Sequence, residues 1–168
     1  MNQEETRDKL AGILQTELTW SATGEKPPPG DPYAVVDPKL WKQACQAARD
    51  DQDLSFNFLR TLCGVDRPDD QKIEVVVHLF SYRHRQAFVL KTLVDRNDPH
   101  LDSVASIWPA AAWHERETFD LLGVKFDGHP DLRRIMLPED WSGHPLRKDY
   151  KEPEQYHGIP TSRPGYEK

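Results

Sequence analysis

Histidines and cysteines are the side chains of this sequence that could bind a metal ion or a cluster. No two histidines form a His-x-x-x-His pair or another compact ligand spacing, and there is no Cys-x-x-Cys motif. Cys45 and Cys63 cannot supply the four thiolates of an iron–sulfur cluster, so we expect free, buried thiols in a reducing cytoplasm. The sequence therefore predicts no metal site, with histidines scattered over strands, turns and the C-terminal tail: His78, His84, His100, His114, His129, His144 and His157.

Two neighbouring carboxylates, Glu115 and Glu117, could form an acid–base pair if they shared one site. Because they are two residues apart in a helical pattern, they point to different sides of the helix. No Gly-rich phosphate loop follows a strand, and no Gly-x-Ser-x-Gly motif is present. The sequence thus predicts no catalytic residue and no cofactor-binding residue on this chain.

These carboxylates lie in a predicted helix that starts at Pro109 and ends before Gly123. Proline suits the first turn of a helix, and glycine can adopt the left-handed conformation that closes one. Large apolar groups occur on both sides, so we expect contacts from more than one direction. The charged triplet alone favours a solvated helix face. In its wider context, we expect Arg116 to be the buried link of a polar network with neighbouring carboxylates such as Asp120.

The stretch from Trp108 to Tyr150, which contains this helix, resembles a family signature. The order is Glu-Arg-Glu, two residues, an acid, two apolar residues, six residues, His, three residues, Arg, one residue and two apolar residues. It is similar to the C subunit of respiratory complex I, the NADH–quinone oxidoreductase, and to its plastid and cyanobacterial counterpart, the J subunit. The matching residues are Glu115, Arg116, Glu117, Asp120, Leu121, Leu122, His129, Arg133, Ile135 and Met136. Further candidate interface residues in the stretch are Arg134, Trp141, Arg147, Lys148 and Tyr150.

The resemblance implies a cofactor-free subunit of the peripheral arm, on the cytoplasmic side of the cell membrane. Its partners would be the quinone-site subunit and the iron–sulfur subunits, and these partners would bind NADH, FMN, the iron–sulfur clusters and quinone. The complex transfers electrons from NADH to quinone and couples this reaction to proton translocation. The chain would act by docking, with Arg133, Arg134, Arg147 and Lys148 pairing with acids across the interface, a contact that suits arginine.

Two other classes of function stay open on the sequence. A homologous subunit of a membrane-bound hydrogenase, or of a ferredoxin-dependent relative of complex I, would share this module but have a different partner. A free-standing small hydrolase would use carboxylates and histidines, although no motif supports it. The proteins that co-purify with the chain distinguish the first class, and a monomeric, active preparation would identify the second.

Upstream of the signature, the hydrophobic pattern predicts an α+β fold with helices packed on a small, mainly antiparallel sheet. Helices are expected at 4–18, after an Asp37-Pro38 cap, and at 54–62. Strands are expected at 33–36 and, as an antiparallel hairpin, at 73–82 and 86–94. The remaining segments are expected to be breaks, turns or loops: 19–32, which contains Pro27-Pro28-Pro29-Gly30, 64–70 and 97–102.

Composition limits the partners. The 168 residues carry 22 basic and 28 acidic side chains, a net charge of −6, which argues against nucleic acid. No apolar run approaches the roughly 20 residues of a membrane-spanning helix. We expect a compact domain at 1–126 and, at 127–168, an extended Pro- and Gly-rich segment that binds partners, because proline removes backbone donors and blocks helices. Apolar anchors argue against disorder as far as Tyr150 and thin out beyond it.

Overall fold

The protein has an α+β fold, as the sequence predicts, in the part that the computed structural model describes, residues 2–21 and 31–161. The proline-rich run at 27–30 lies outside the described residues. The helices are α1 (Gln3–Leu14), the 3₁₀ turn η1 (Pro38–Leu40), α2 (Trp41–Asp50) and α3 (Ala111–Leu122). The strands are β1 (Thr19–Trp20), β2 (Tyr33–Val35), β3 (Phe58–Arg67), β4 (Lys72–Ser81), β5 (Gln86–Asp95), β6 (His100–Asp102), β7 (Lys125–Asp127), β8 (Gln155–Tyr156) and β9 (Ile159–Pro160).

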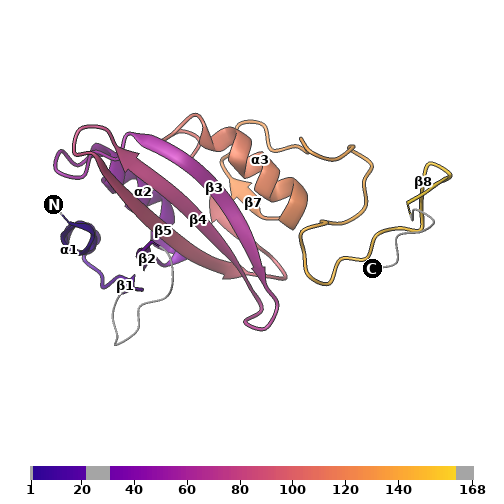
Figure 1. Cartoon of the computed structure of the whole chain (residues 1–168), viewed down its shortest axis with the longest axis horizontal. Helices are drawn as coiled ribbons and strands as arrows, with labels where there is room; N and C mark the ends of the chain where they lie inside the picture. The colour runs from indigo at the N-terminus through magenta and orange to yellow at the C-terminus, as the bar shows by residue number, and fades with distance from the viewer. Residues whose placement is uncertain (1, 22–30, 162–168) are drawn as a thin grey trace.

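A five-stranded sheet with the order β1-β2-β5-β4-β3 forms the centre of the molecule (Figure 1). β4 and β5 form the predicted antiparallel hairpin, paired without interruption from Lys72–Asp95 to Ser81–Gln86. β2 runs parallel to β5, whereas β1 and β3 are antiparallel to their neighbours, so the sheet is mixed but mainly antiparallel. Two smaller pairs, β6–β7 and β8–β9, lie outside this sheet.

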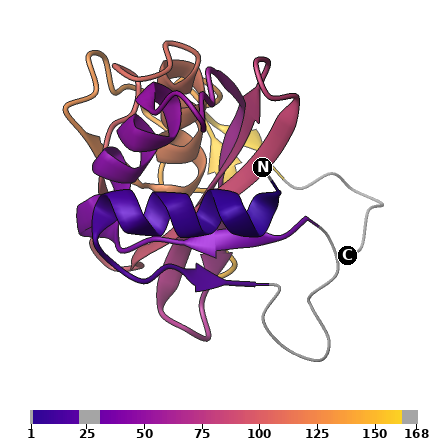
Figure 2. The same cartoon turned by 90° about the vertical axis from the view of Figure 1, so that its left-hand side faces the viewer.

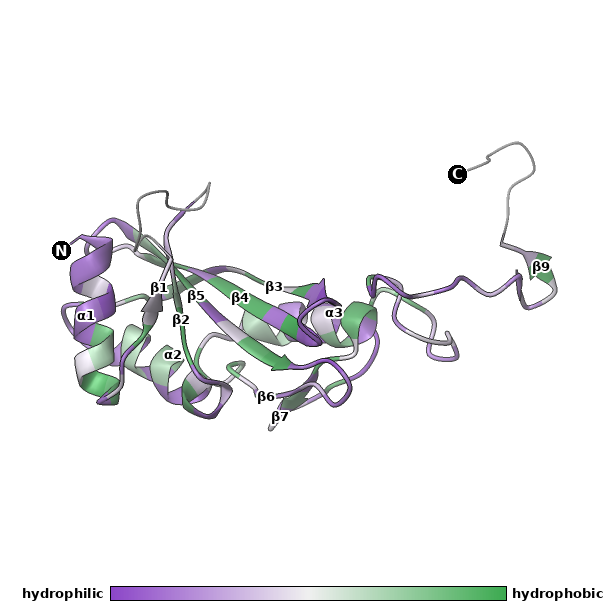
Figure 3. Ribbon diagram, turned by 90° about the horizontal axis from the view of Figure 1, so that it is seen from below, coloured by the Kyte–Doolittle hydropathy of each residue, from purple (hydrophilic) through white to green (hydrophobic). Residues whose placement is uncertain are grey.

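One face of the sheet is covered by the helices and contains the hydrophobic core. Leu10 of α1 and Trp41 and Cys45 of α2 are fully buried in it, so the predicted burial of Cys45 is confirmed. Figure 2 shows α1 and α2 next to each other at one end of the molecule, and Figure 3 shows α2 and the β6–β7 pair on one side of the sheet. The alternating residues predicted to face this way are buried: Ile73, Val75, Val77, Leu79, Phe88, Leu90, Thr92 and Val94.

The opposite face of the sheet, called the open face below, is only partly buried. Val76 and Val89 are buried among their neighbours, whereas Phe58, Val65 and Leu93 are exposed. In Figure 3 this face is turned away from α2. The sequence predicts this difference, because alternate residues of the hairpin are strongly apolar on one side and mixed on the other.

The prediction of a helix at 54–62 is wrong, because the chain from Phe58 onward forms β3. A β-bulge between Leu59 and Thr61 shifts the register of β3 against β4. As a result, Leu59 and Leu62 both face the core although they are three residues apart, which is the spacing of a helical face. The bulge therefore produces the hydrophobic spacing of a helix within a strand. The turn predicted from residue 64 starts only after Arg67, where β3 ends.

Three smaller expectations also differ from the structure. α1 ends at Leu14, four residues early, because Gln15 adopts a left-handed conformation with φ +52°. Cys63 is exposed, since its position on β3 places it on the open face. The loop predicted at 97–102 ends in β6, which pairs with β7 and carries the chain past α2.

Gly64 of β3 lies where the sheet meets α3. A Cβ atom there would overlap Leu122 Cδ1 and lie 3.0 Å from Thr118 Cγ2, and Leu122 is buried. We predict that Gly64→Ala lowers the free energy of unfolding by ~1–3 kcal/mol, the range for overpacked cores. Urea denaturation of the purified chain measures this change.

The matched control for this substitution is Gly12→Ala in α1. A Cβ atom at Gly12 meets nothing within 4 Å, and alanine stabilises a helix interior by roughly 0.5–1 kcal/mol relative to glycine. The two variants should therefore shift stability in opposite directions. A stabilised Gly64→Ala chain would mean that α3 does not pack closely on β3.

Candidate docking site on helix α3 and the C-terminal segment

α3 ends at Gly123, as predicted. This glycine has φ +82°, and its N–H donates to Phe119 O at 2.8 Å. A Cβ atom at Gly123 would lie 2.7 Å from His144 Nε2. Glycine is therefore needed both for the left-handed backbone and for the close approach of the C-terminal segment, by which we mean residues 127–161.

The C-terminal segment completes the end of α3. The last carbonyl groups of a helix have no partners within the helix. Here the carbonyl oxygens of the last three residues of α3 lie 2.9 Å from His144 Nδ1, 3.0 Å from the N–H of Leu146 and 2.8 Å from Arg147 Nε. Arg147 also places a positive charge at the negative end of the helix dipole, which is favourable. The segment therefore forms part of the cap of α3.

Asp120 is the central acceptor of this site, and its side chain is fully buried. Oδ2 accepts the backbone N–H groups of residues 135, 136 and 137 at 3.0, 2.7 and 2.9 Å, and Oδ1 accepts Arg134 Nη1 at 2.6 Å. Burial acts to raise the pKa of Asp120, but these hydrogen bonds outweigh it and hold the pKa below its usual value. A charged carboxylate therefore fixes the segment through consecutive N–H groups, and we call this arrangement the Asp120 clip.

Arg134 makes further contacts within its own chain. Its Nη2 donates to Trp141 O at 2.9 Å and to Gly143 O at 3.2 Å. We expected Arg134 to pair with acids of another subunit. In the structure its carboxylate partner is Asp120 of its own chain. Arg133, in contrast, is exposed and pairs only locally, with Asp131 at 2.9 Å. The two adjacent arginines thus have different roles, which the shared residue type could not reveal.

Arg116 is mostly buried, as predicted, but Asp120 is not its partner, and the carboxylate that it approaches is Asp131, 4.0 Å from Nη1. Its Nε and Nη2 donate to the carbonyl oxygens of Arg133 and Arg134, both at 3.1 Å. The guanidinium group also lies over the ring of Trp113, 5.4 Å from its centroid. Arg116 therefore holds the backbone of the C-terminal segment, while Asp120 pairs with Arg134 and Glu117 is exposed.

Glu115 is fully buried on the other side of α3. It accepts Ser103 Oγ at 2.6 Å and the N–H of Val104 at 2.7 Å. Burial raises the pKa of Glu115 to about 7, and these two hydrogen bonds and the charge of Lys42 only partly oppose that shift. Glu115 is buried and Glu117 is exposed, so the two side chains point to different sides of α3, as predicted.

His129 closes the turn that leads into the C-terminal segment. Nδ1 accepts the N–H of Asp131 and Nε2 lies within hydrogen-bonding distance of Ala112 O, both at 3.0 Å. Because an N–H group can only donate, Nδ1 carries no proton, and Nε2 donates to the carbonyl. The ring lies 3.9 Å from Glu115 Oε2. His129 is thus a hydrogen-bonded turn residue.

A second set of contacts fixes the segment to the sheet, and no pattern in the sequence indicates it. Arg96 donates to Asp66 at 2.7 and 3.0 Å and to Asp149 at 2.6 and 3.1 Å. Lys148 takes part through its backbone N–H, which donates to Asp66 Oδ2 at 2.7 Å. The hydrogen bonds from Arg96 and Lys148 outweigh partial burial and lower the pKa of Asp66. We call this arrangement the Arg96 bridge.

The far part of the segment is held by aromatic side chains. Trp141 Nε1 donates to the hydroxyl of Tyr150 at 3.0 Å, and the Trp141 ring packs on Tyr156 with centroids 5.0 Å apart. Tyr156 and His157 both bond to Asp140, at 2.8 and 2.7 Å. Trp141 and Tyr150, both candidate interface residues, are therefore in direct contact.

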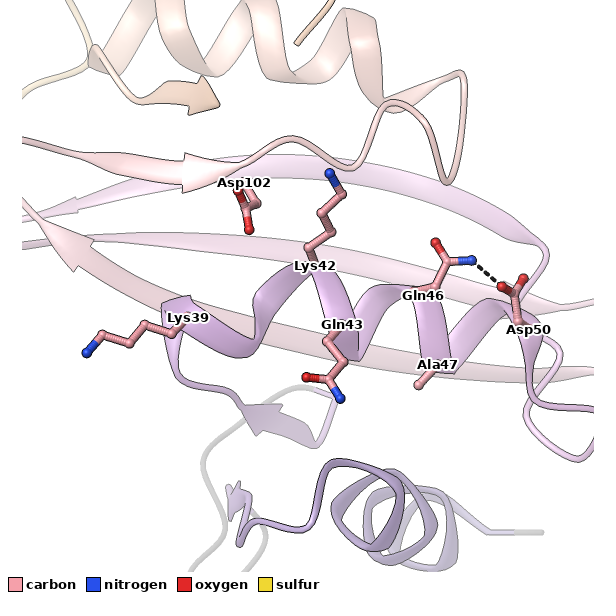
Figure 4. A pocket seen from close by; sticks show the side chains of 7 residues that line it. All are labelled: Lys39, Lys42, Gln43, Gln46, Ala47, Asp50 and Asp102. Atoms are coloured by element: carbon pink, nitrogen blue, oxygen red, sulfur yellow. Dashed lines mark hydrogen bonds between the residues drawn. The ribbon is translucent and has the colours of Figure 1, made fainter. Parts of the chain in front are cut away.

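A hollow on the outer side of α2 is open to solvent, and its side chains point in different directions rather than toward one point (Figure 4). Within residues 2–21 and 31–161, no group of three His, Cys, Asp or Glu side chains is placed to hold a metal ion. The hollow is lined by Lys39, Lys42, Gln43, Gln46, Ala47, Asp50 and Asp102.

The site defines an α+β module whose C-terminal segment is fixed on one helix by buried charges. The family model of the respiratory-chain NADH dehydrogenase 30 kDa subunit matches residues 34–156, and the chain belongs to this family. The NADH-quinone oxidoreductase C subunit of Roseiflexus sp. (strain RS-1) is 49% identical over 121 residues, which cover 71% of this chain and 70% of that protein. The corresponding protein of Chlorobium phaeobacteroides is 46% identical over 130 residues, covering 76% and 77%.

Two solved structures share the fold. A trypsin-resistant fragment (1–134) of Nqo5 matches with a TM-score of 0.63 and 26% identity, over 79% of this chain and 100% of the fragment. A chain of the membrane-bound sulfane sulfur reductase, an archaeal respiratory membrane complex, matches with a TM-score of 0.72 over 88% of this chain and 85% of its own length, at 22% identity. The second likeness is one of fold alone. None of the helices in the described part of our chain has the length and apolar character needed to cross a membrane.

Adjacent arginines give a matched test of the Asp120 clip. We predict that Arg134→Ala lowers the free energy of unfolding by ~2–4 kcal/mol, because it leaves the buried carboxylate of Asp120 without its cation. Arg133→Ala, which removes only an exposed pair, should change stability by less than ~0.5 kcal/mol. Chemical denaturation of both variants measures the difference. Equal stabilities would mean that the clip does not form in the free chain.

The raised pKa of Glu115 predicts a pH dependence of stability. Its folded pKa of about 7 exceeds the ordinary value of 4.5, so the folded chain binds this proton more tightly. Its contribution to stability is therefore complete below pH 4.5 and is lost as pH rises through 7. We expect the stability of the native chain to fall by ~1–3 kcal/mol relative to Glu115→Gln over this range. Denaturation at several pH values, with Glu117→Gln as the exposed control, measures it, and parallel curves for all three chains would contradict it.

Proposed function

We propose that this chain is a subunit of the peripheral arm of a NADH–quinone oxidoreductase, where it docks the quinone-site and iron–sulfur subunits. Its family membership and the names of its relatives support this proposal. The observation that carries the docking role is the use of two signature residues, Arg116 and Asp120, together with Arg134, which directly follows the signature arginine. Arg116, Asp120 and Arg134 do not converge on a ligand but hold the C-terminal segment against α3.

The segment, once held, presents a surface for other chains. Trp113 of α3 and Met136 of the segment are 63% and 61% exposed, and Leu146 is also exposed. Large exposed apolar side chains of this kind mark sites of protein interaction. Because the buried charges fix the backbone beforehand, less conformational entropy is lost when a partner binds. The site therefore has the properties of a preformed docking surface.

In this proposal the chain supports catalysis without carrying the reaction. The partner subunits bind NADH, FMN, the iron–sulfur clusters and quinone, and the complex couples electron transfer to proton translocation. Our chain lies on the cytoplasmic side of the membrane as a peripheral subunit and holds its neighbours in place. The division into a domain at 1–126 and a partner-binding segment at 127–168 belongs to the same proposal. A trypsin-resistant fragment of Nqo5 supports a stable domain in this fold.

Purification of the whole complex tests this function. A tagged chain expressed in place of the native one should co-purify with quinone-site and iron–sulfur subunits, and its deletion should abolish NADH-dependent quinone reduction by membranes. We predict that Trp113→Ser with Met136→Ser lowers the free energy of unfolding of the free chain by no more than ~1 kcal/mol, through the lost contact with Arg116. The same variant should weaken binding to the complex about tenfold, a loss of ~1.4 kcal/mol. Subunit quantification by mass spectrometry measures the incorporation.

The control for that variant is Ile13→Ser, which removes an exposed apolar side chain from α1. It should assemble normally, because α1 lies at the other end of the molecule from the C-terminal segment (Figure 1). Recovery of the native chain as an active monomer would contradict the proposed function. Recovery with the subunits of a nickel–iron hydrogenase would identify the alternative class instead.

A further inference from the structure

A group of aromatic and arginine side chains lies at the end of the sheet where β4 turns into β5. It consists of Phe58, Phe80, Tyr82, Arg83 and Arg85, and we call it the hairpin patch. The rings of Phe58 and Tyr82 have centroids 5.4 Å apart, and those of Phe80 and Tyr82 are 5.3 Å apart. Phe58 is 43% exposed and Tyr82 is 61% exposed. The rings therefore form one cluster that remains largely accessible to solvent.

The hairpin patch belongs to the open face of the sheet. Phe58 pairs directly with Phe80 across β3 and β4, next to the core-facing pair of Leu59 and Leu79. Since neighbouring residues of a strand point to opposite faces, the two phenylalanine rings point away from α2 and the core. The N–H of Tyr82 donates to Asn57 Oδ1 at 3.3 Å, which ties the start of the turn to the chain just before β3. The patch is thus built on a paired strand end rather than on a free loop.

The charge of the hairpin patch contrasts with that of the whole chain. Arg83 and Arg85 are exposed, and among the residues that the structure describes neither forms an ion pair. The turn approaches residue 52, whose carbonyl oxygen lies 3.0 Å from His84 Nε2. The carboxylates on either side of residue 52, Asp51 and Asp53, are already paired with Lys9. Two exposed arginines without an ion pair to any described residue therefore follow Tyr82 in the turn, in a protein whose net charge is −6.

The backbone of this turn adds a second observation. Arg85 has φ +52°, a left-handed conformation that glycine or asparagine adopts at lower cost. The loop spans four residues, 82–85, a length usually built around a type I turn, and its left-handed position carries arginine. The strained position gives no packing advantage to the core, because the side chain is exposed. The exposed Arg85 side chain, in the turn that follows Tyr82, is therefore available to a partner.

We propose that the hairpin patch is a second docking surface, which receives an acidic and partly apolar protein surface of another subunit. Exposed Tyr and Arg side chains around a packed aromatic cluster are the composition of interface hot spots. Carboxylates on the partner would match the two unpaired arginines. The inference rests on the proposed function, since it assumes that the chain works within a complex.

The position of the patch separates it from the first site. β5 begins beside the N-terminal end of α1, where Gln3 Nε2 donates to Ala87 O at 3.3 Å. In Figure 1 this end of the sheet lies on the left, whereas α3 and the C-terminal segment lie on the right. The two surfaces therefore lie toward opposite ends of the domain, and the chain would link two neighbours or two parts of one.

A photocrosslinking amino acid at position 82, in the chain assembled into the purified complex, tests the proposal directly. We expect crosslinks to another subunit, at a surface whose flanking residues include Asp or Glu. The same probe at position 136 reports on the first site and serves as the positive control. Crosslinks from position 136 but none from position 82 would overturn the hairpin patch while leaving the proposed function intact. Crosslinks only to lipid, or only to a second copy of this chain, would also overturn it.

Two variants provide an independent measurement. Tyr82→Ala with Arg83→Glu should reduce incorporation into the complex about tenfold, equivalent to ~1.4 kcal/mol. Loss of the ring contacts of Tyr82 should lower the free energy of unfolding of the free chain by no more than ~1.5 kcal/mol, which urea denaturation checks. Lys39→Glu in η1 makes the same change in net charge at a distant exposed position and should assemble normally. If both variants assemble like the native chain, or if both are impaired equally, a specific role for the patch is overturned.

Discussion

A single buried carboxylate determines the arrangement of the C-terminal half of this protein. Asp120 is withdrawn from water on α3, and a charge in that position is costly unless it is paired and hydrogen-bonded. Three consecutive backbone N–H groups and one guanidinium meet that need. The proline-rich segment after residue 127 has little capacity to form regular structure of its own, so its path is set by this acceptor rather than by a helix or a sheet.

The other contacts of the segment follow from the same geometry. Once residues 134–137 lie on Asp120, the chain passes the end of α3 and reaches the carbonyl groups that the helix leaves unpaired. The Arg96 bridge then ties the segment to the sheet, because its two carboxylates come from β3 and from the segment. The buried polar groups of α3 thus find their hydrogen-bond partners on the segment. Asp149 of the segment in turn shares Arg96 with Asp66 of the sheet.

Sequence patterns predict the local elements better than the contacts between them. The β4–β5 hairpin and the glycine that ends α3 follow from alternation and from backbone preference, which are properties of neighbouring residues. The strand β3 does not follow from the pattern, because a bulge gives Leu59 and Leu62 a helical spacing. No local property pairs Arg96 with Asp66, since that contact depends on how two strands and the segment come together in space.

The signature residues illustrate the same limit. Family resemblance draws attention to Arg116, Asp120 and Arg134, and charge complementarity suggests that they pair with carboxylates or with partners. The spacing could not show that Arg116 binds carbonyl groups, nor that Arg134 turns inward while Arg133 turns outward. Such choices depend on the path of an irregular segment, which has no periodicity from which a direction can be predicted.

The order of synthesis gives the Asp120 clip a further consequence. α3 leaves the ribosome before the residues that neutralise its buried carboxylate and cap its last carbonyl groups. Until residues 134–149 have been made, the helix carries an unmatched charge and an open end, and its packing against Gly64 of β3 is opposed by both. The packing of α3 is therefore completed only after residues 134–149 have been made, so a product terminated before them would lack both the cation of Asp120 and the cap of α3.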